Sequence, residues 1–542
     1  MNTFTISGNI VDIIGKKITP GTISIVNGFI ESVIYDNTSN KQFIMPGFID
    51  SHIHIESSML APSEFAKIAV THGTIAAVAD PHEIANVMGM QGIEFMIENG
   101  ETTPFQFFFG APSCVPATPF ETAGATITVD NIKELLENPK IKFLSEMMNF
   151  PGVIYDNSDV IAKLNIAKAA RKPIDGHAPG LRGDALRKYI SAGISTDHES
   201  MTLDKALEKI SLGMKVLIRE GSAAKNFSSL NSLIDTHNDM VMLCSDDKHP
   251  DDLSVGHINL LIKQALLVGH DLFNILRCAI FNPIKHYNLN IGMVQSGDRA
   301  DFVVVDDLQN FNIKETFIKG EKVAENGKSL IESTNIRLIN NFNTKEKTIE
   351  DFRIESKSSK IRVIGAIDGQ LITESIIADC TIENGNLISN TETDILKIAV
   401  VNRYSIAPPS IGFIKNFGLK SGAIASSVAH DSHNIIAVGT SDREICIAIN
   451  AIIRTKGGMA IYSDSVQKIL PLPIAGLMSN EDCATVGKKY SELTQAAKSL
   501  GCTLHAPFMT LSFMALPVIP HLKLTDKGLF DVGKFEFTSL FV

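Results

Sequence analysis

A strand-then-helix pattern repeats through residues 48–296 and limits the folds open to this chain. Helical segments such as residues 158–171 and 203–213 separate most of the strand-like runs. Eight β-α units in about 250 residues predict a (β/α)8 barrel, which carries its functional groups at the carboxyl ends of the strands. The strand-like runs are residues 43–56, 73–83, 105–114, 141–149, 172–180, 193–200, 215–221 and 240–247.

An open, doubly wound α/β sheet is the main competitor of the barrel. Such a sheet is expected to carry a glycine-rich phosphate-binding loop after an early strand. Neither a G-x-G-x-x-G motif nor a P-loop occurs there in this sequence. The predicted fold class is therefore an α/β barrel of the TIM type.

Short strands and turns flank the repeat on both sides. Residues 1–47 alternate apolar with polar side chains, and residues 297–335 have the same texture. The N-terminal segment is too short to bury a core alone. We therefore predict one small β domain built from both flanks, with residues 48–296 inserted as the barrel. Residues 345–542 are predicted to be a third domain of mixed β and α structure.

The first strand-like run ends in the motif His52-x-His54. Side chains alternate faces along an extended strand, so both imidazoles project to the same side. The motif alone is weak evidence, because two-residue patterns recur by chance. Similar polar residues stand where the other apolar runs end, and these are Asp80, His82, Glu83, Glu146, His177, His198 and Asp246.

In a closed barrel these strand ends converge on one mouth. Any one of Glu146, His177 or His198 alone is more often structural than catalytic, but together they favour a site for divalent transition metals. One carboxylate between two ions can bridge them, and two cations lower the pKa of a bound water from about 15.7 towards neutrality. The resulting hydroxide can attack an electrophilic carbon. We predict Asp246 as both ligand and general base.

The net charge and the cysteine pattern limit which binding partners and which cellular compartment are expected. The 542 residues include 49 basic and 60 acidic side chains, a net charge of −11, without a dense Lys/Arg tract, which argues against nucleic-acid binding. No signal peptide and no apolar window of about 18 residues is recognisable, so no membrane association is expected. The seven cysteines are scattered and never form a C-x-x-C pair, which is typical of a cytoplasmic protein.

The arrangement of histidines and acids resembles the amidohydrolase superfamily, and more narrowly the bacterial and archaeal adenine deaminases. The likeness extends over nearly the whole chain. Its C-terminal stretches, VAHDSHNIIAVGT, LPLPIAGLMS and PFMTLSFMALPVIPHLKLTDKGL, are more specific than the metal pattern that the superfamily shares. The matching barrel stretches are PGFIDSHIHIESSML, ADPHEIANV, FLSEMMNFPGV, DGHAPGL, GISTDHE and CSDDKHPDDL.

The resemblance implies a dinuclear site that hydrolyses adenine to hypoxanthine and ammonia, with hydroxide attacking C6. It makes Glu146 the bridging ligand and Asp246 a ligand of the first metal. It implies two divalent ions, Mn²⁺ first and Fe²⁺ as the alternative, and a homo-oligomer, which we expect to be a dimer. The implied histidine ligands are His52 and His54 for the first metal and His177 and His198 for the second.

The segment Asp80-Pro81-His82-Glu83 is open to three interpretations: it orients ligands, transfers protons or caps the next helix. Glu83 or His82 is the candidate for moving protons to the purine and the leaving ammonia. The zinc nucleobase deaminases are excluded, because His54-x-Glu56 has no P-C-x-x-C partner.

Two other functions stay open at this point. One is another amidohydrolase reaction, such as cyclic-amide hydrolysis or deacetylation, on the same metals. The other is an inactive barrel that serves as a binding module. Retention of every expected ligand argues against the inactive barrel, because a buried charge cluster is costly unless it is paired or metal-bound.

Overall fold

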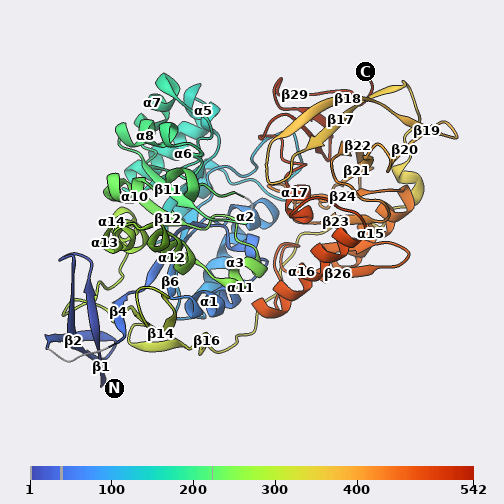
Figure 1. Cartoon of the computed structure of the whole chain (residues 1–542). Helices are drawn as coiled ribbons and strands as arrows, with labels where there is room; N and C mark the ends of the chain where they lie inside the picture. The colour runs from blue at the N-terminus through green and yellow to red at the C-terminus, as the bar shows by residue number, and fades with distance from the viewer. Residues whose placement is uncertain (1–2, 37–40, 223) are drawn as a thin grey trace.

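The computed structural model describes residues 3–36, 41–222 and 224–542. Figure 1 shows the barrel in blue and green, a small sheet at its lower edge near the N-terminus, and a C-terminal part in yellow and red beside the barrel. The chain leaves the small sheet in an extended segment and enters the C-terminal part. The small sheet and the C-terminal part therefore each lie against the barrel.

The eight predicted barrel strands are present, and the (β/α)8 fold is confirmed. Five parallel strands in the order β5-β6-β7-β8-β9 are followed by β10-β11-β12. The ring closes where Asp246 N–H donates to the His52 carbonyl at 2.9 Å and His54 N–H donates to the Asp246 carbonyl at 3.3 Å. The strands are β5 (Phe48–Ile53), β6 (Thr74–Ala79), β7 (Gln106–Ala111), β8 (Ile141–Met147), β9 (Ile174–Gly176), β10 (Thr196–Asp197), β11 (Lys215–Arg219) and β12 (Val241–Cys244).

Helices cover the outside of the barrel, which explains the apolar composition of its strands. All six residues of β6 are buried, as expected for a parallel strand with a core on one face and helices on the other. Among the described residues, none of the helices has the length and apolar character needed to cross a membrane. The helices of this part are α1 (Pro62–Thr71), α2 (His82–Met88), α3 (Met90–Gly100), α4 (Val129–Glu137), α5 (Phe150–Ile154), α6 (Ser158–Ala169), α7 (Gly183–Ser191), α8 (Leu203–Ser211), α9 (Phe227–Leu230), α10 (Leu233–Thr236), α11 (Pro250–Val255), α12 (Ile258–Val268), α13 (Leu272–Leu276) and α14 (Asn282–Tyr287).

The small sheet takes strands from both sides of the barrel in sequence. Its order is β16-β15-β14-β13-β4-β1-β2-β3, and β13 runs antiparallel to β4 with Phe302 opposite Pro46. Its core contains Ile10, Ile25 and Phe317, which pack with Phe302. The domain limits 1–47 and 297–335 stay predictions. The strands are β1 (Thr3–Asp12), β2 (Lys17–Val26), β3 (Phe29–Tyr35), β4 (Phe43–Pro46), β13 (Phe302–Val305), β14 (Ile313–Ile318), β15 (Glu321–Glu325) and β16 (Lys328–Ser329).

The C-terminal part is built on a mostly antiparallel sheet in the order β18-β17-β22-β21-β24-β23-β25-β26. Helix α15 (Asp442–Thr455) packs on it through Ile445, Ile449 and Ile452. Helices α16 (Cys483–Ser499) and α17 (Pro507–Ser512) lie nearer the barrel (Figure 1). The strands of the sheet are β17 (Lys360–Ala366), β18 (Thr373–Asp379), β21 (Ile395–Val401), β22 (Ser410–Lys415), β23 (Ala423–Ser426), β24 (Ile435–Gly439), β25 (Gly458–Tyr462) and β26 (Gln467–Pro471).

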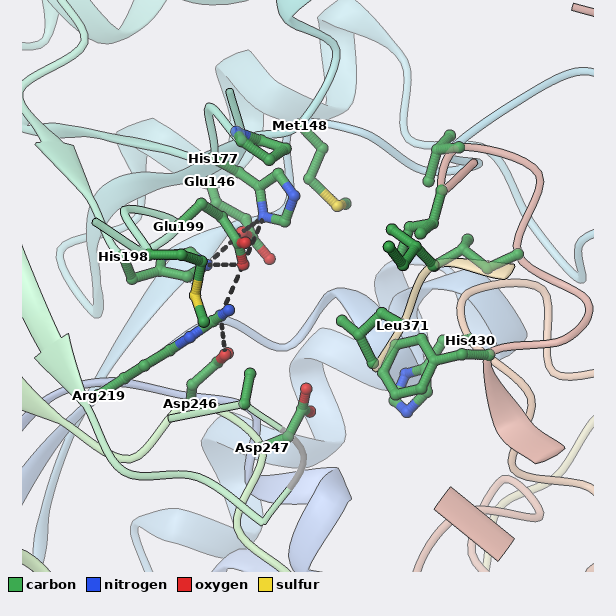
Figure 2. Close-up of a pocket in the computed structure, with 18 of the residues that line it drawn as sticks. Glu146, Met148, His177, His198, Glu199, Arg219, Asp246, Asp247, Leu371 and His430 are labelled. Carbon is green, nitrogen blue, oxygen red and sulfur yellow. Dashed lines mark hydrogen bonds and ion pairs between the residues drawn. The ribbon is translucent and has the colours of Figure 1, made fainter. Parts of the chain in front are cut away.

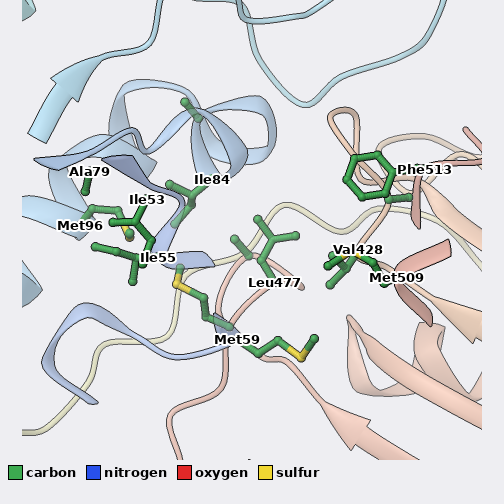
Figure 3. Close-up of a cluster of buried hydrophobic side chains, with 14 of the residues drawn as sticks. Ile53, Ile55, Met59, Ala79, Ile84, Met96, Val428, Leu477, Met509 and Phe513 are labelled. Atoms are coloured by element: carbon green, nitrogen blue, oxygen red, sulfur yellow. The ribbon is translucent and has the colours of Figure 1, made fainter. Parts of the chain in front are cut away.

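One continuous apolar core joins the barrel to the C-terminal part. Figure 3 shows Met59, which follows β5, next to Leu477, and the two belong to the same buried cluster as Met509. A backbone hydrogen bond from Ser479 N–H to the Met59 carbonyl, 2.8 Å long, fixes this contact. The C-terminal part is therefore packed rigidly beside the barrel mouth, where it can contribute to a site.

Candidate active site

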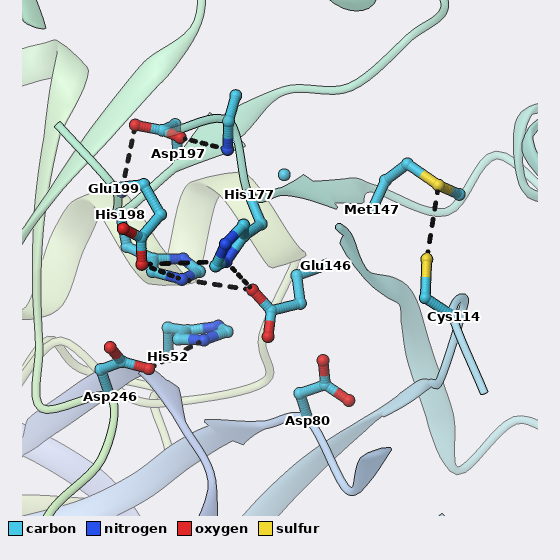
Figure 4. Close-up of polar contacts among 12 residues, drawn as sticks. His52, Asp80, Cys114, Glu146, Met147, His177, Asp197, His198, Glu199 and Asp246 are labelled. Carbon is cyan, nitrogen blue, oxygen red and sulfur yellow. Dashed lines mark hydrogen bonds and ion pairs between the residues drawn. The ribbon is translucent and has the colours of Figure 1, made fainter. Parts of the chain in front are cut away.

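Glu146, on β8, lies at the centre of the residues that the sequence singled out (Figure 4). Its Oε2 lies 2.9 Å from His177 Nδ1 and 3.2 Å from His198 Nε2. Its Oε1 lies 3.4 Å from His54 Nε2. The two oxygens therefore face two different groups of imidazoles, which is the arrangement that a carboxylate shared by two cations needs.

Asp246 lies on the other side of His54, just after β12. Its Oδ1 is 3.3 Å from His54 Nε2 and 3.6 Å from His52 Nε2. All six predicted ligands thus converge on one site. His52, His54 and Asp246 offer ligand atoms within 4.8 Å of one another, as do His52, Glu146 and His198.

The donor set fits divalent metal ions. His52 Nε2 is buried without a hydrogen-bond partner among the described residues, and so is Asp80 Oδ2. Buried polar atoms without partners are costly, and each of these two belongs to a group of side chains that could hold a cation. Imidazole and carboxylate ligands, without a thiolate, suit Mn²⁺, Fe²⁺ or Zn²⁺ rather than soft metals.

The electrostatics keep one imidazole and both carboxylates of the predicted ligand set in metal-competent protonation states. Burial holds the pKa of His52 well below its ordinary value, so this imidazole is neutral. Burial alone would raise the pKa of Glu146, but neighbouring His177 and His198 hold it well below its usual range. Burial would likewise raise the pKa of Asp246, but the Arg219 guanidinium keeps it well below its usual range.

Arg219 and Glu199 were not among the predicted site residues. Arg219, at the end of β11, donates to Glu199 Oε1 at 2.6 Å and also to Asp246 Oδ2 (Figure 2). Glu199 Oε1 is 3.6 Å from His198 Nε2. The signal was present in the sequence, since both residues stand at strand ends, where the other candidates were found. Arg219 favours the charged form of Asp246, which suits both roles predicted for it, because a metal ligand and a general base must each be deprotonated.

A buried ion pair behind the site orients two of the histidines. Asp197 precedes His198, and its Oδ1 accepts the amide of Ala178, which follows His177, at 2.9 Å. Lys209 Nζ donates to Asp197 Oδ2 at 2.6 Å and to the Ala178 carbonyl at 3.0 Å. One lysine thus ties the ends of β9 and β10 together.

We expect Lys209→Met to destabilise the protein by about 3–5 kcal/mol, because it leaves the Asp197 carboxylate buried without its cation. The measurement is the barrel's unfolding transition in urea. Lys188→Met is the matched control: Lys188 pairs with Asp156 at the surface, where such pairs contribute about 0–1 kcal/mol. Equal, small losses in both variants would contradict the role given to Lys209.

The structure places His82 beside the centre and gives Glu83 different neighbours. His82 Nδ1 is 3.2 Å from Asp80 Oδ2 and 3.6 Å from Glu146 Oε1. Both oxygens of Glu83 meet imidazoles of the C-terminal part, those of His430 and His433. The sequence could not reveal these contacts, although VAHDSHN stood out as a motif. The roles of His82 and Glu83 in moving protons stay predictions.

A cavity of about 660 Å³ opens above the centre (Figure 2). One wall is the barrel mouth, with Glu146, His177 and Asp246. The opposite wall comes from the C-terminal part, where His430 and Leu371 face the cavity. The ring of Phe513 stacks on His430 with centroids 4.6 Å apart. A small, flat molecule would lie between charged groups on one side and a largely apolar wall on the other.

The fold and the site together define a metal-dependent hydrolase built on a (β/α)8 barrel. Residues 43–323 match the model of the amidohydrolase family, and residues 370–536 match the adenine deaminase C-terminal domain. The chain is 52% identical to an adenine deaminase of Methanosarcina mazei, over 98% of this chain and 99% of that protein. It is 48% identical to one of Salinibacter ruber, over 100% and 99%. The chain therefore belongs to the adenine deaminase family, within the amidohydrolases.

Proposed function

We propose that this chain hydrolyses adenine to hypoxanthine and ammonia. The observation that carries the proposal is Glu146, whose two oxygens face separate groups of imidazoles at the floor of a cavity with ample room for a purine base. Full-length relatives named adenine deaminase support the substrate. The C-terminal wall of the cavity supports it too, because its apolar side chains suit the faces of a planar base.

Six residues are proposed to hold two divalent ions, with Glu146 shared between them. His52, His54 and Asp246 would hold the first ion. His177 and His198 would hold the second. Such ions supply Lewis acidity and lower the pKa of water towards neutrality. Mn²⁺ is the proposed metal and Fe²⁺ the alternative, which the oxygen and nitrogen ligand set supports.

The chain's own side chains would position the base and move its protons. Asp246 is proposed to take the proton of the attacking water, since its Oδ1 faces the same imidazoles as Glu146. His82 lies between Glu146 and the C-terminal wall, so it is placed to pass a proton towards the purine. In hydrolysis at C6 one proton of the water ends on the amino group, which departs as ammonia, and the other ends on the ring nitrogen N1, while C6 gains a carbonyl oxygen.

Ammonia release from a panel of substrates tests the proposal. The protein is reconstituted with Mn²⁺ under reducing conditions and offered adenine, adenosine, guanine and cytosine, with dihydroorotate ring opening followed separately. We expect ammonia from adenine alone. A protein that binds metal but leaves adenine intact contradicts the proposal and returns the site to another amidohydrolase reaction. Absence of bound metal after reconstitution would instead favour the inactive barrel.

We also propose a homodimer and a cytoplasmic location. The dimer rests on the family alone. The location is supported by the cysteines, all seven of which are free thiols. Size-exclusion chromatography with light scattering would test the dimer.

A further inference from the structure

Glu83 connects the barrel to a short loop of the C-terminal part. It lies in the first turn of α2, and its Oε1 and Oε2 meet His430 Nδ1 and His433 Nε2. The Ala429 amide donates to His433 Nδ1 at 3.2 Å, so the proton of neutral His433 is on Nε2, facing Glu83. These groups satisfy one another without a cation. We therefore interpret Glu83 and its two histidines as a clamp, not as a third metal site.

The clamp positions Asp431 at the cavity. Asp431 stands between the two clamped histidines, lines the cavity and is only 4% exposed. Its Oδ1 is 4.0 Å from His82 Nε2. Its Oδ2 is buried and has no hydrogen-bond partner among the described residues. A buried acceptor without a donor is destabilising, so a ligand that supplies an N–H there gains binding free energy.

The chemistry of adenine identifies that N–H, and this step rests on the proposed function. Adenine has N–H donors in two places: the exocyclic amino group and one nitrogen of the imidazole ring. The amino group leaves during the reaction, so it must face the metal centre. The ring N–H then remains for the opposite wall, where Asp431 lies and where the stacked His430 and Phe513 offer a flat surface.

We propose that Asp431 is a substrate-binding residue whose carboxylate accepts the imidazole-ring N–H of adenine and so selects the free base over its nucleosides. A nucleoside carries a sugar at N9 and has no ring N–H. Its binding would leave the Asp431 oxygen buried without a donor. A site built to accept a hydrogen bond discriminates strongly against an analogue that lacks the donor.

The test compares adenine with 9-methyladenine, which keeps the amino group and lacks the ring N–H. For the unaltered protein we expect kcat/KM to favour adenine by about 10², from the cost of the unpaired acceptor. In Asp431→Ala, kcat/KM for adenine should fall about 10²-fold, mainly through KM, while that for 9-methyladenine stays nearly constant. The ratio of the two substrates should therefore collapse towards one.

Metal content and melting temperature are measured for each variant. Asp431→Asn keeps an acceptor oxygen, so its ratio of kcat/KM for adenine to that for 9-methyladenine should be larger than that of Asp431→Ala. A metal-loaded Asp431→Ala with an unchanged ratio overturns the inference. A preference for adenine over 9-methyladenine below about tenfold in the unaltered protein also overturns it, and this measurement requires no variant. If the unaltered protein leaves adenine intact, the proposed function itself has failed.

The clamp has a test of its own. His433→Gln alters no cavity-lining residue, but it removes the imidazole that anchors the far end of the loop. We expect the preference for adenine over 9-methyladenine to drop by about tenfold, with metal content unchanged, because Asp431 is then less well positioned. A lower melting temperature with an unchanged preference would show that His433 is only structural.

Discussion

Asp246→Asn is expected to lower kcat for adenine by about 10²- to 10⁴-fold, the usual effect of removing a positioned proton-transfer group. The carboxylate lies at the junction of the predicted metal ligands and Arg219, so the change removes the proposed base and weakens a proposed ligand together. Steady-state kinetics on manganese-reconstituted protein measures the effect. Metal analysis of the same samples separates the two losses.

Asp239→Asn is the matched control for Asp246. Asp239 is an exposed carboxylate that pairs with Arg277 away from the cavity, so its loss should leave kcat unchanged. If Asp246→Asn retains both metals and loses rate, the proton-transfer role is supported. If it keeps most of its activity, the mechanism proposed for Asp246 is wrong.

Glu146→Gln is expected to lower bound metal below two ions per chain and to lower activity with it. The amide has one oxygen and no charge, so it cannot face both groups of imidazoles as the carboxylate does. Residues that only hydrogen-bond to a metal ligand typically contribute about 10- to 100-fold to metal affinity. A ligand shared by two ions should contribute at least as much. Elemental analysis after dialysis gives the metal count.

Glu64→Gln controls for the loss of a buried carboxylate in the same barrel. Glu64 lies in α1, is buried, and pairs with Lys67 at 2.9 Å. This variant should bind two ions and turn over adenine normally. Full occupancy of two ions in Glu146→Gln would refute the shared role of Glu146, whatever its activity.

The C-terminal part forms the second wall of the cavity, and this wall shields the bound base from water. Leu371, Phe513 and Leu516 line the side opposite the proposed metal ligands. A wall of this kind excludes water from one face of the base and strengthens the electrostatic interactions inside. An isolated barrel would hold the ligands and leave the substrate exposed. The clamp between Glu83 and His430 joins the two walls across the mouth.

The barrel and the convergence of its candidate ligands could be predicted from the sequence because both depend on local patterns. Apolar runs alternate with helical segments at a fixed spacing, and the end of each run marks the mouth of the barrel. His52 and His54 share a face because strand side chains alternate, and Glu146 stands at the end of its own run. These residues needed no knowledge of distant contacts to be placed in one site.

Contacts between distant segments were decided only by the tertiary structure. Glu83 and His433 are 350 residues apart in the sequence, and no periodicity links them. The pairing of Lys209 with Asp197 and of Arg219 with Asp246 depends on the register of neighbouring strands and helices. By itself, the sequence determined the fold class and singled out the candidate ligands, since these follow from local periodicity and strand ends. Which side chains form the second wall of the cavity followed from the packing of the C-terminal part against the barrel through their shared apolar core.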